Sequence, residues 1–255
     1  MITFGRTIPN VGYEARFRRE MKRMIKAMHK DTVAEISQNF NTLAKDAPLT
    51  LTSIMAMLRE KWYKVFQKKA REMARWLVST VGKRSRSMIM QQLKKIDFVI
   101  TPQYSVKQKE LIASMVEEAT ELIKSIPQKY LRNVQETVRD SFESGGDMHT
   151  IKERIKDKID LPEKQAERRA ELIAKDQVNK VTQNFAVEEA KAVGATKGEW
   201  IHVAGEFSSR ITHVHMDGKT FDLDVGMFDE EVGEYVKPGQ LPYCMCQFQA
   251  IFPGM

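Results

Sequence analysis

Apolar side chains recur every three or four residues through the first 145 positions, which is the spacing of helices with one buried face. Residues 14–45 contain neither Gly nor Pro, so we expect a helix over 12–45 that ends before Pro48. A second helix is expected from Thr52 to Val81, with Gly82 at its end. The two apolar stripes are Met21, Ile25, Met28, Val33 and Ile36, then Trp62, Phe66, Met73, Trp76 and Leu77.

Three shorter helices are expected over 84–97, 104–125 and 128–143, with Pro127 separating the last two. Residues 97–105, "DFVITPQYS", favour an extended or loop segment. The strongest break is "SGGD" at 144–147, where we place a domain boundary. Residues 1–145 would then be a helical region, either a bundle or an extended arm, and residues 146–255 a second domain.

The second domain begins with helical patterns and ends with strand patterns. A short helix is expected over 148–159 and a longer one over 161–194, with Pro162 in its first turn and Gly194 past its end. The apolar face of the longer helix is Ala166, Ala170, Ile173, Ala174, Val178, Val181 and Phe185. Short alternating runs follow, namely "EWIHVAG", "KTFDLD" and "CQFQAIF". They predict a short antiparallel sheet, so the fold class is α+β with a mostly α-helical N-terminal region.

Charge is distributed unevenly along the chain, whose net charge is +7. Residues 59–95 carry twelve Lys and Arg against Glu60 and Glu72, whereas residues 220–236 carry six acidic residues and no basic one. Phosphate contacts from the basic helices would give sequence-independent binding to double-stranded DNA, and a solvated basic face is the alternative. The candidate DNA contacts are Arg16, Arg18, Arg19, Lys22, Arg23, Lys64, Lys68, Lys69, Arg71 and Arg75. The acidic stretch is expected to be a solvated loop or, in a functional role, to dock on a basic partner.

Other classes of protein are disfavoured by what the chain lacks. No run of 18 apolar residues is present, so neither a membrane span nor a membrane partner is expected. The N-terminal residues lack the charged start and apolar stretch of a secretory signal. The two cysteines cannot build a disulfide framework, which favours a reducing cytoplasm as the place of synthesis.

Histidines and cysteines gather near the C-terminus. His213, His215, Cys244 and Cys246 are ligand types that suit a tetrahedral zinc ion, the one cofactor that the sequence suggests. If both pairs lay on strands, the members of each pair would share a face. The spacings H-x-H and C-x-C are nevertheless shorter than those of usual structural zinc sites. Cysteines that act as small buried hydrophobic residues, beside histidines that hydrogen-bond the turn, are the alternative.

The same residues also permit an enzymatic alternative. A metal-dependent nuclease or toxin-like hydrolase would use His213, His215 and Cys244, with Asp217 as the only orienting group in the turn. An assembled set of acid and base is missing outside that turn, so we expect no catalytic residues and no enzyme.

The order of motifs in the C-terminal part resembles the phage Mu F-like family of minor head proteins. The helix segment "ELIAKDQVNKV" precedes a strand with Trp200, then the turn "SSRITHVHMDGKTF", and the unit closes with "KPGQLPYCMC". The likeness covers about residues 165–252. Its turn residues are Arg210, His213, Asp217 and Gly218, and its closing residues are Pro238, Gly239, Cys244 and Cys246. Met245 stands where the family usually has Arg.

This resemblance implies a structural role in the virion. A head morphogenesis protein of this kind would lie inside the procapsid near the portal, bind the portal protein, with the major capsid or scaffolding protein as a further partner, and aid DNA packaging or delivery. Some relatives have C-x-x-C where this chain has Arg210 and His213, which leaves His213, Cys244 and Cys246 as the matching positions. Within the turn, Arg210 is expected to pair with Asp217, and Gly218 to adopt a positive φ.

Overall fold

The computed structural model describes residues 2–3, 5–43, 45, 47–94, 105–204 and 209–252. The helices of the first half are α1 (Val11–Gln38), α2 (Phe40–Leu43), α3 (Ala47–Lys94) and α4 (Val106–Glu143). They are followed by α5 (Met148–Lys158) and α6 (Asp160–Ala192). The extended segment expected at 97–105 lies, apart from its last residue, outside the described residues.

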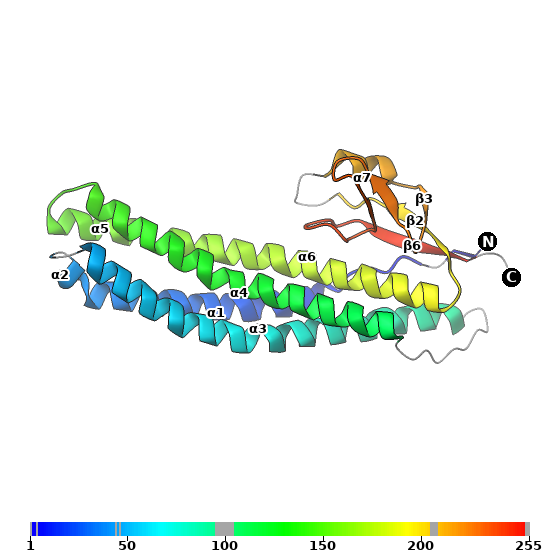
Figure 1. Ribbon diagram of the computed structural model, residues 1–255, viewed down its shortest axis with the longest axis horizontal. Coiled ribbons are helices and arrows are strands. Elements are labelled where there is room, and N and C mark those ends of the chain that lie inside the picture. Colours follow the sequence, from blue (N-terminus) through cyan, green and yellow to red (C-terminus); the bar gives the residue numbers. More distant parts are fainter. Residues whose placement is uncertain are drawn as a thin grey trace. The chain divides into compact units, whose positions relative to one another are not determined.

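The C-terminal part alternates short strands with one short helix. Its elements are β2 (Lys197–Ile201), α7 (Ile211–Met216), β3 (Thr220–Asp222), β4 (Met227–Asp229), β5 (Glu234–Val236) and β6 (Gln247–Phe252). Together with β1 (Ile2–Thr3), three of these strands form an antiparallel sheet of order β1-β6-β2-β3, while β4 and β5 form a hairpin (Figure 1). The predicted α+β class, with a mostly helical N-terminal region, is confirmed.

Two predicted breaks between helices, at Gly82 and Pro127, are wrong, and both errors have a physical reason. Gly82 lies inside α3, which continues to Lys94. A Cβ atom at Gly82 would lie 2.4 Å from Cζ of Phe185, so glycine is needed for close packing against α6 and does not end the helix. Pro127 likewise lies inside α4. The missing N–H of Pro127 weakens one turn but does not divide the helix, because apolar residues on both sides of it are buried.

Pro48 does not stop a preceding helix either. The first helix ends earlier than predicted, at Gln38, and α3 begins at Ala47 with Pro48 in its first turn. A proline is tolerated there because the first turn of a helix leaves its N–H groups without intrahelical partners.

The described chain forms two compact units, and each unit combines separate stretches of sequence. Unit 2 consists of Arg16–Ala74 and Glu117–Ile173, and unit 1 consists of Met1–Ala15, Arg75–Val116 and Ala174–Met255. The turn predicted at 144–147 is present, with Gly145 and Gly146 at positive φ and Asp147 capping α5. Unit 2 includes residues on both sides of this turn. The two units therefore do not test a domain boundary at residue 145, which stays a prediction.

Unit 2 is a helical bundle in which segments of α1, α3, α4 and α6 run alongside one another (Figure 1). Polar contacts join the helices: Lys22 Nζ lies 2.7 Å from Glu171 Oε1, and His29 Nδ1 lies 3.0 Å from the Tyr130 hydroxyl. The predicted apolar stripes supply much of its core, including Met21, Ile25, Met28, Ile36, Trp62, Phe66 and Met73. None of the helices in the described part of the chain has a stretch long and apolar enough for a membrane span.

Unit 1 holds the sheet and packs it on the C-terminal part of α6. The apolar face predicted for α6 is buried there, with Ala174, Val178, Val181 and Phe185 all at most 3% exposed. Trp200 in β2 is fully buried and makes edge-on contacts with Phe221 and His213. This core places α7 beside the segment that precedes β6.

Candidate functional site

The turn before β3 is helical, so the strand geometry that would place His213 and His215 on one face does not apply. Both residues belong to α7. Residues two positions apart on a helix face away from each other, and accordingly His213 is 2% exposed whereas His215 is exposed. His213 alone of this pair can join a buried site.

Cys244 and Cys246 lie in the irregular segment just before β6. Both thiols are free and buried, and Met245 between them is partly exposed. The segment is held from α6: the side-chain amide of Asn179 donates to the carbonyl oxygens of Cys244, at 2.8 Å, and Cys246, at 3.2 Å.

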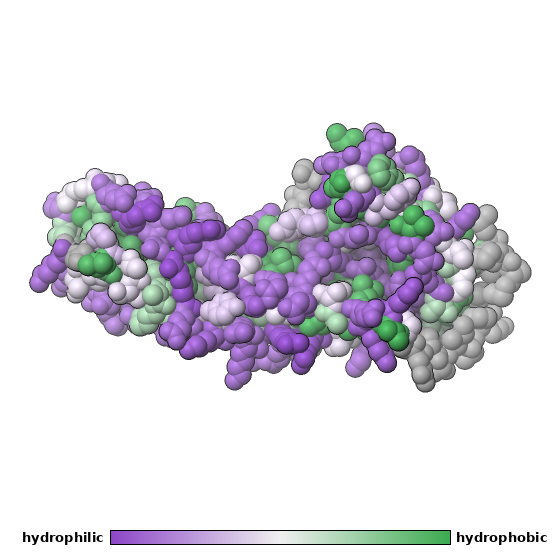
Figure 2. Space-filling model, in the orientation of Figure 1, coloured by the Kyte–Doolittle hydropathy of each residue, from purple (hydrophilic) through white to green (hydrophobic). Residues whose placement is uncertain are grey.

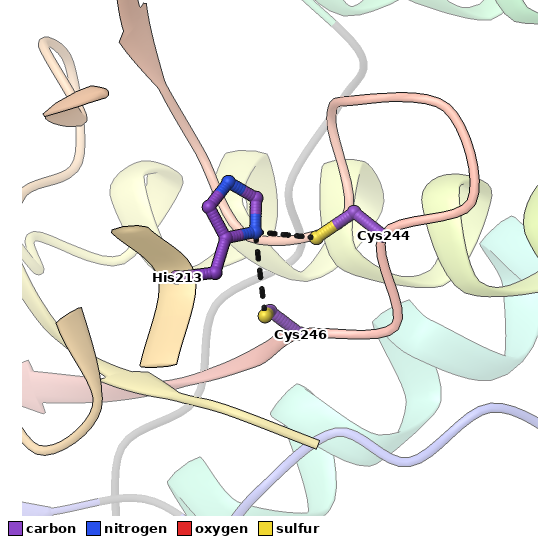
Figure 3. Close-up of side chains that lie close together, drawn as sticks. All are labelled: His213, Cys244 and Cys246. Carbon is purple, nitrogen blue, oxygen red and sulfur yellow. Dashed lines mark hydrogen bonds between the residues drawn. The ribbon is translucent and has the colours of Figure 1, made fainter. Parts of the chain in front are cut away.

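His213, Cys244 and Cys246 converge on one point (Figure 3). Nδ1 of His213 lies 3.3 Å from Cys244 Sγ and 3.7 Å from Cys246 Sγ. All three ligand atoms lie within 4.8 Å of one another, and all three residues are buried. Three of the four residues predicted from sequence as zinc ligands are therefore brought together, and His215 is not.

Neighbouring groups control the protonation of this cluster. A hydrogen bond from the Cys246 thiol holds the pKa of Cys244 well below its usual range, against the effect of burial, and His213 acts in the same direction as Cys246. The pKa of Cys246 is raised, first by its hydrogen bond to Cys244 and then by burial. Burial would lower the pKa of His213, but Cys244 and Asp229 outweigh it and raise that pKa overall. Cys244 is therefore the more acidic of the two thiols.

Asp229 is a site residue that sequence reasoning did not single out. It comes from the acidic stretch expected to be solvated, yet its side chain is 0% exposed and its Oδ2 lies 3.0 Å from His213 Nε2. Its other oxygen accepts a hydrogen bond from the backbone N–H of Glu231. Asp229 thus fixes the ring so that Nδ1 faces the sulfur atoms. The sequence does not distinguish Asp229 from the other five acidic residues of this stretch.

His202 is the second residue that sequence reasoning missed. It follows β2 directly, and its Nδ1 lies 3.6 Å from Cys246 Sγ. Its backbone N–H donates to Asp217 Oδ1 at 2.7 Å. In the sequence, His202 could be noticed only as a histidine two positions after Trp200, and that position alone does not indicate a metal ligand.

The remaining turn residues maintain the fold. Arg210 donates to the carbonyl oxygen of Pro242 and Asp217 accepts from His202, so the structure gives these two residues other partners than each other. Gly218 has φ +71°, as predicted. The turn therefore anchors both the segment before β6 and the end of β2.

Residues 132–249 match the family model described as Phage Mu protein F like protein. These residues form a phage Mu F-like module. No curated protein matches the chain, and no solved structure does. The match includes every residue of the His/Cys cluster, and it begins within α4, earlier than the sequence resemblance suggested. The family indicates a head morphogenesis protein of a phage, which is a structural role.

In the Mu F-like module, polar side chains of α6 bind the backbone of the cysteine segment, and two of them, Asp176 and Asn179, belong to the helix segment that carried the resemblance. Asp176 Oδ1 accepts from the backbone N–H of Tyr243 at 2.5 Å, and Gln183 Oε1 accepts from that of Phe248 at 3.3 Å. Tyr243 needs such support because its φ is 60°, in the left-handed region. With Asn179 between them, these side chains fasten the cysteine segment to the helix along its length.

The triad of Cys244, His213 and Asp229 has the connectivity of a cysteine hydrolase. A nucleophile must meet its substrate, however, and Cys244 is only 4% exposed. A second sulfur also lies near the same nitrogen of His213, at 3.7 Å. Two buried thiols around one imidazole nitrogen suit ligation of a soft cation better than attack on a carbonyl carbon.

The candidate DNA contacts lie outside the Mu F-like module, on α1 and α3. Exposed or partly exposed side chains are found at all ten positions. Some already have acidic partners: Lys22 pairs with Glu171, and Lys64 with Glu60. Lys68 and Arg71 are exposed and lie one turn apart on α3.

Proposed function

We propose that this protein is a minor head protein that acts inside the procapsid of a tailed phage, at the portal, during DNA packaging or delivery. The observation that carries the proposal is the match of residues 132–249 to the Mu F-like family. In this proposal the His/Cys cluster and the sheet around it maintain the fold of the C-terminal part, and α1 and α3 supply contacts to the portal and to DNA.

The surface of the helical bundle supports contact with packaged DNA. Its visible face is largely hydrophilic (Figure 2). On α3, the exposed Lys68 and Arg71 lie at positions i and i+3, which places them on one stripe of the helix. A stripe of exposed cations binds phosphates without reading bases, as a protein inside a filled capsid requires.

Counting the chain in purified particles tests the proposed location. Quantitative mass spectrometry of procapsids and mature virions should find a fixed, low number of copies per portal ring. Cross-linking within intact procapsids should join residues of α1 or α3 to the portal protein. Absence of the chain from both kinds of particle would reject the proposal.

Salt-dependent binding tests the contact with DNA separately. Lys68→Gln with Arg71→Gln should lower the steepness of log K against log salt by about 2 on a double-stranded fragment. The matched control is Lys64→Gln with Lys69→Gln, because Glu60 and Glu72 already pair with these lysines, at 2.7 and 2.9 Å. Both variants lose two positive charges, so equal losses of affinity would show that net charge alone matters and would contradict a contact by Lys68 and Arg71.

A further inference from the structure

The distances within the His/Cys cluster match those of a tetrahedral zinc site. Zinc bonds of about 2.3 Å to sulfur and about 2.0 Å to nitrogen place neighbouring S and N ligands about 3.5 Å apart. The observed separations from His213 Nδ1 are 3.3 Å to Cys244 Sγ and 3.7 Å to Cys246 Sγ. Both separations therefore lie within a few tenths of an ångström of the spacing around zinc.

The surroundings of His213 favour a metal ligand. Asp229 holds Nε2, which leaves Nδ1 directed at the sulfur atoms, and this carboxylate–histidine arrangement is typical of ligating histidines. Trp200 packs edge-on against the ring, with centroids 5.1 Å apart, and restrains it from another side. The ring is thus oriented before any ion arrives.

A fourth ligand is available at the end of β2. His202 Nδ1 lies 3.6 Å from Cys246 Sγ, again close to the spacing expected around zinc. His202 lies next to Cys246 but farther from His213 and Cys244, so its partly exposed side chain must turn toward these two ligands. Its backbone is already fixed by Asp217, which restricts the movement to the side chain.

We propose that the Mu F-like module binds one structural Zn²⁺ through His213 Nδ1, Cys244 Sγ, Cys246 Sγ and His202 Nδ1. Two thiolates and two imidazoles form a closed, four-coordinate set. The ion joins three segments of the chain: the end of β2, α7, and the residues before β6. It stabilises the module, and it does so whether or not the chain acts at the portal.

Metal analysis of the full-length protein tests this site. After incubation with Zn²⁺ and removal of the excess, the protein should retain one equivalent of zinc, and Co²⁺ in its place should give the thiolate-to-metal absorption of a tetrahedral site. Cys246→Ser should abolish both signals. Absence of bound zinc, or a cobalt spectrum without thiolate bands, would overturn the proposal.

His202 and His215 provide a matched pair of variants that does not depend on a buried core residue. His202→Ala should weaken zinc binding by at least about 10-fold, judged against a competing chelator. His215→Ala, on the exposed side of α7, should leave the affinity unchanged. Circular dichroism establishes that each variant is folded. Equal affinities for wild type and His202→Ala, or a loss confined to His215→Ala, would refute this ligand set.

Discussion

Asn179 links the helix of the Mu F-like module to its cysteine segment, and its removal should destabilise unit 1. The residue is 1% exposed and donates to two carbonyl oxygens, those of Cys244 and Cys246. A buried carbonyl that loses its donor costs about 1–3 kcal/mol. Since the two carbonyls share one amide group, we expect Asn179→Ala to lower the free energy of unfolding by about 2–4 kcal/mol.

The chemistry of the substitution can be separated from its size. Asn179→Asp keeps the shape but replaces the donating amide by a carboxylate that faces two carbonyl oxygens, so it should cost at least as much as the alanine variant. Asn133→Ala is the control, because this amide donates at 2.7 Å to Gln165 in an exposed pair. The control should change stability by less than about 0.5 kcal/mol.

Urea unfolding, with a chelator present throughout, gives the free energies. Hydrogen exchange of residues 244–252 shows whether the loss is local to the cysteine segment and β6. The reasoning fails if Asn179→Ala costs no more than Asn133→Ala, or if exchange accelerates throughout unit 2 while residues 244–252 stay protected.

Two further predictions concern packing and pH. Gly82→Ala should destabilise unit 1 by about 1 kcal/mol despite the better helix propensity of alanine, because its Cβ would overlap the Phe185 ring. Thermal unfolding should show that the double variant with Phe185→Leu regains part of this loss. A single variant that is more stable than wild type would contradict the packing argument. Burial of Asp31 acts to raise its pKa, but hydrogen bonds from Lys61 and Trp62 lower it overall, so its stabilising effect is present at neutral pH and is lost as the pH falls below about 4. Asp31→Asn should therefore cost about 1–2 kcal/mol at pH 7 and progressively less as the pH is lowered below about 4 in urea unfolding, whereas a cost independent of pH would disprove the role of the charge.

Local patterns in the sequence were sufficient wherever one helix face or one turn decided the outcome. The apolar face predicted for α6 is the buried face, because a 3.6-residue period leaves only one stripe to cover. Gly218 adopts the predicted positive φ, because a side chain there would be strained. The α+β class followed from the change from helical to alternating spacing after Gly194.

Single glycine and proline residues predicted helix ends less well. Gly82 and Pro127 were expected to end helices, and both lie within them. Glycine at position 82 is explained by a neighbour more than a hundred residues away, the Phe185 ring. Propensity describes a residue in its own segment and carries no information about such a neighbour.

The His/Cys cluster shows most clearly which part of the site the sequence determined and which part the tertiary structure decided. The sequence by itself identified His213, Cys244 and Cys246 by residue type, and residue type is a local property. Only the tertiary structure decided between the two histidines of H-x-H, because α7 is a helix and turns His215 away. Asp229 and His202 entered the site for the same reason: hydrogen bonds and sheet pairing bring together atoms whose separation along the chain predicts nothing about their distance in space.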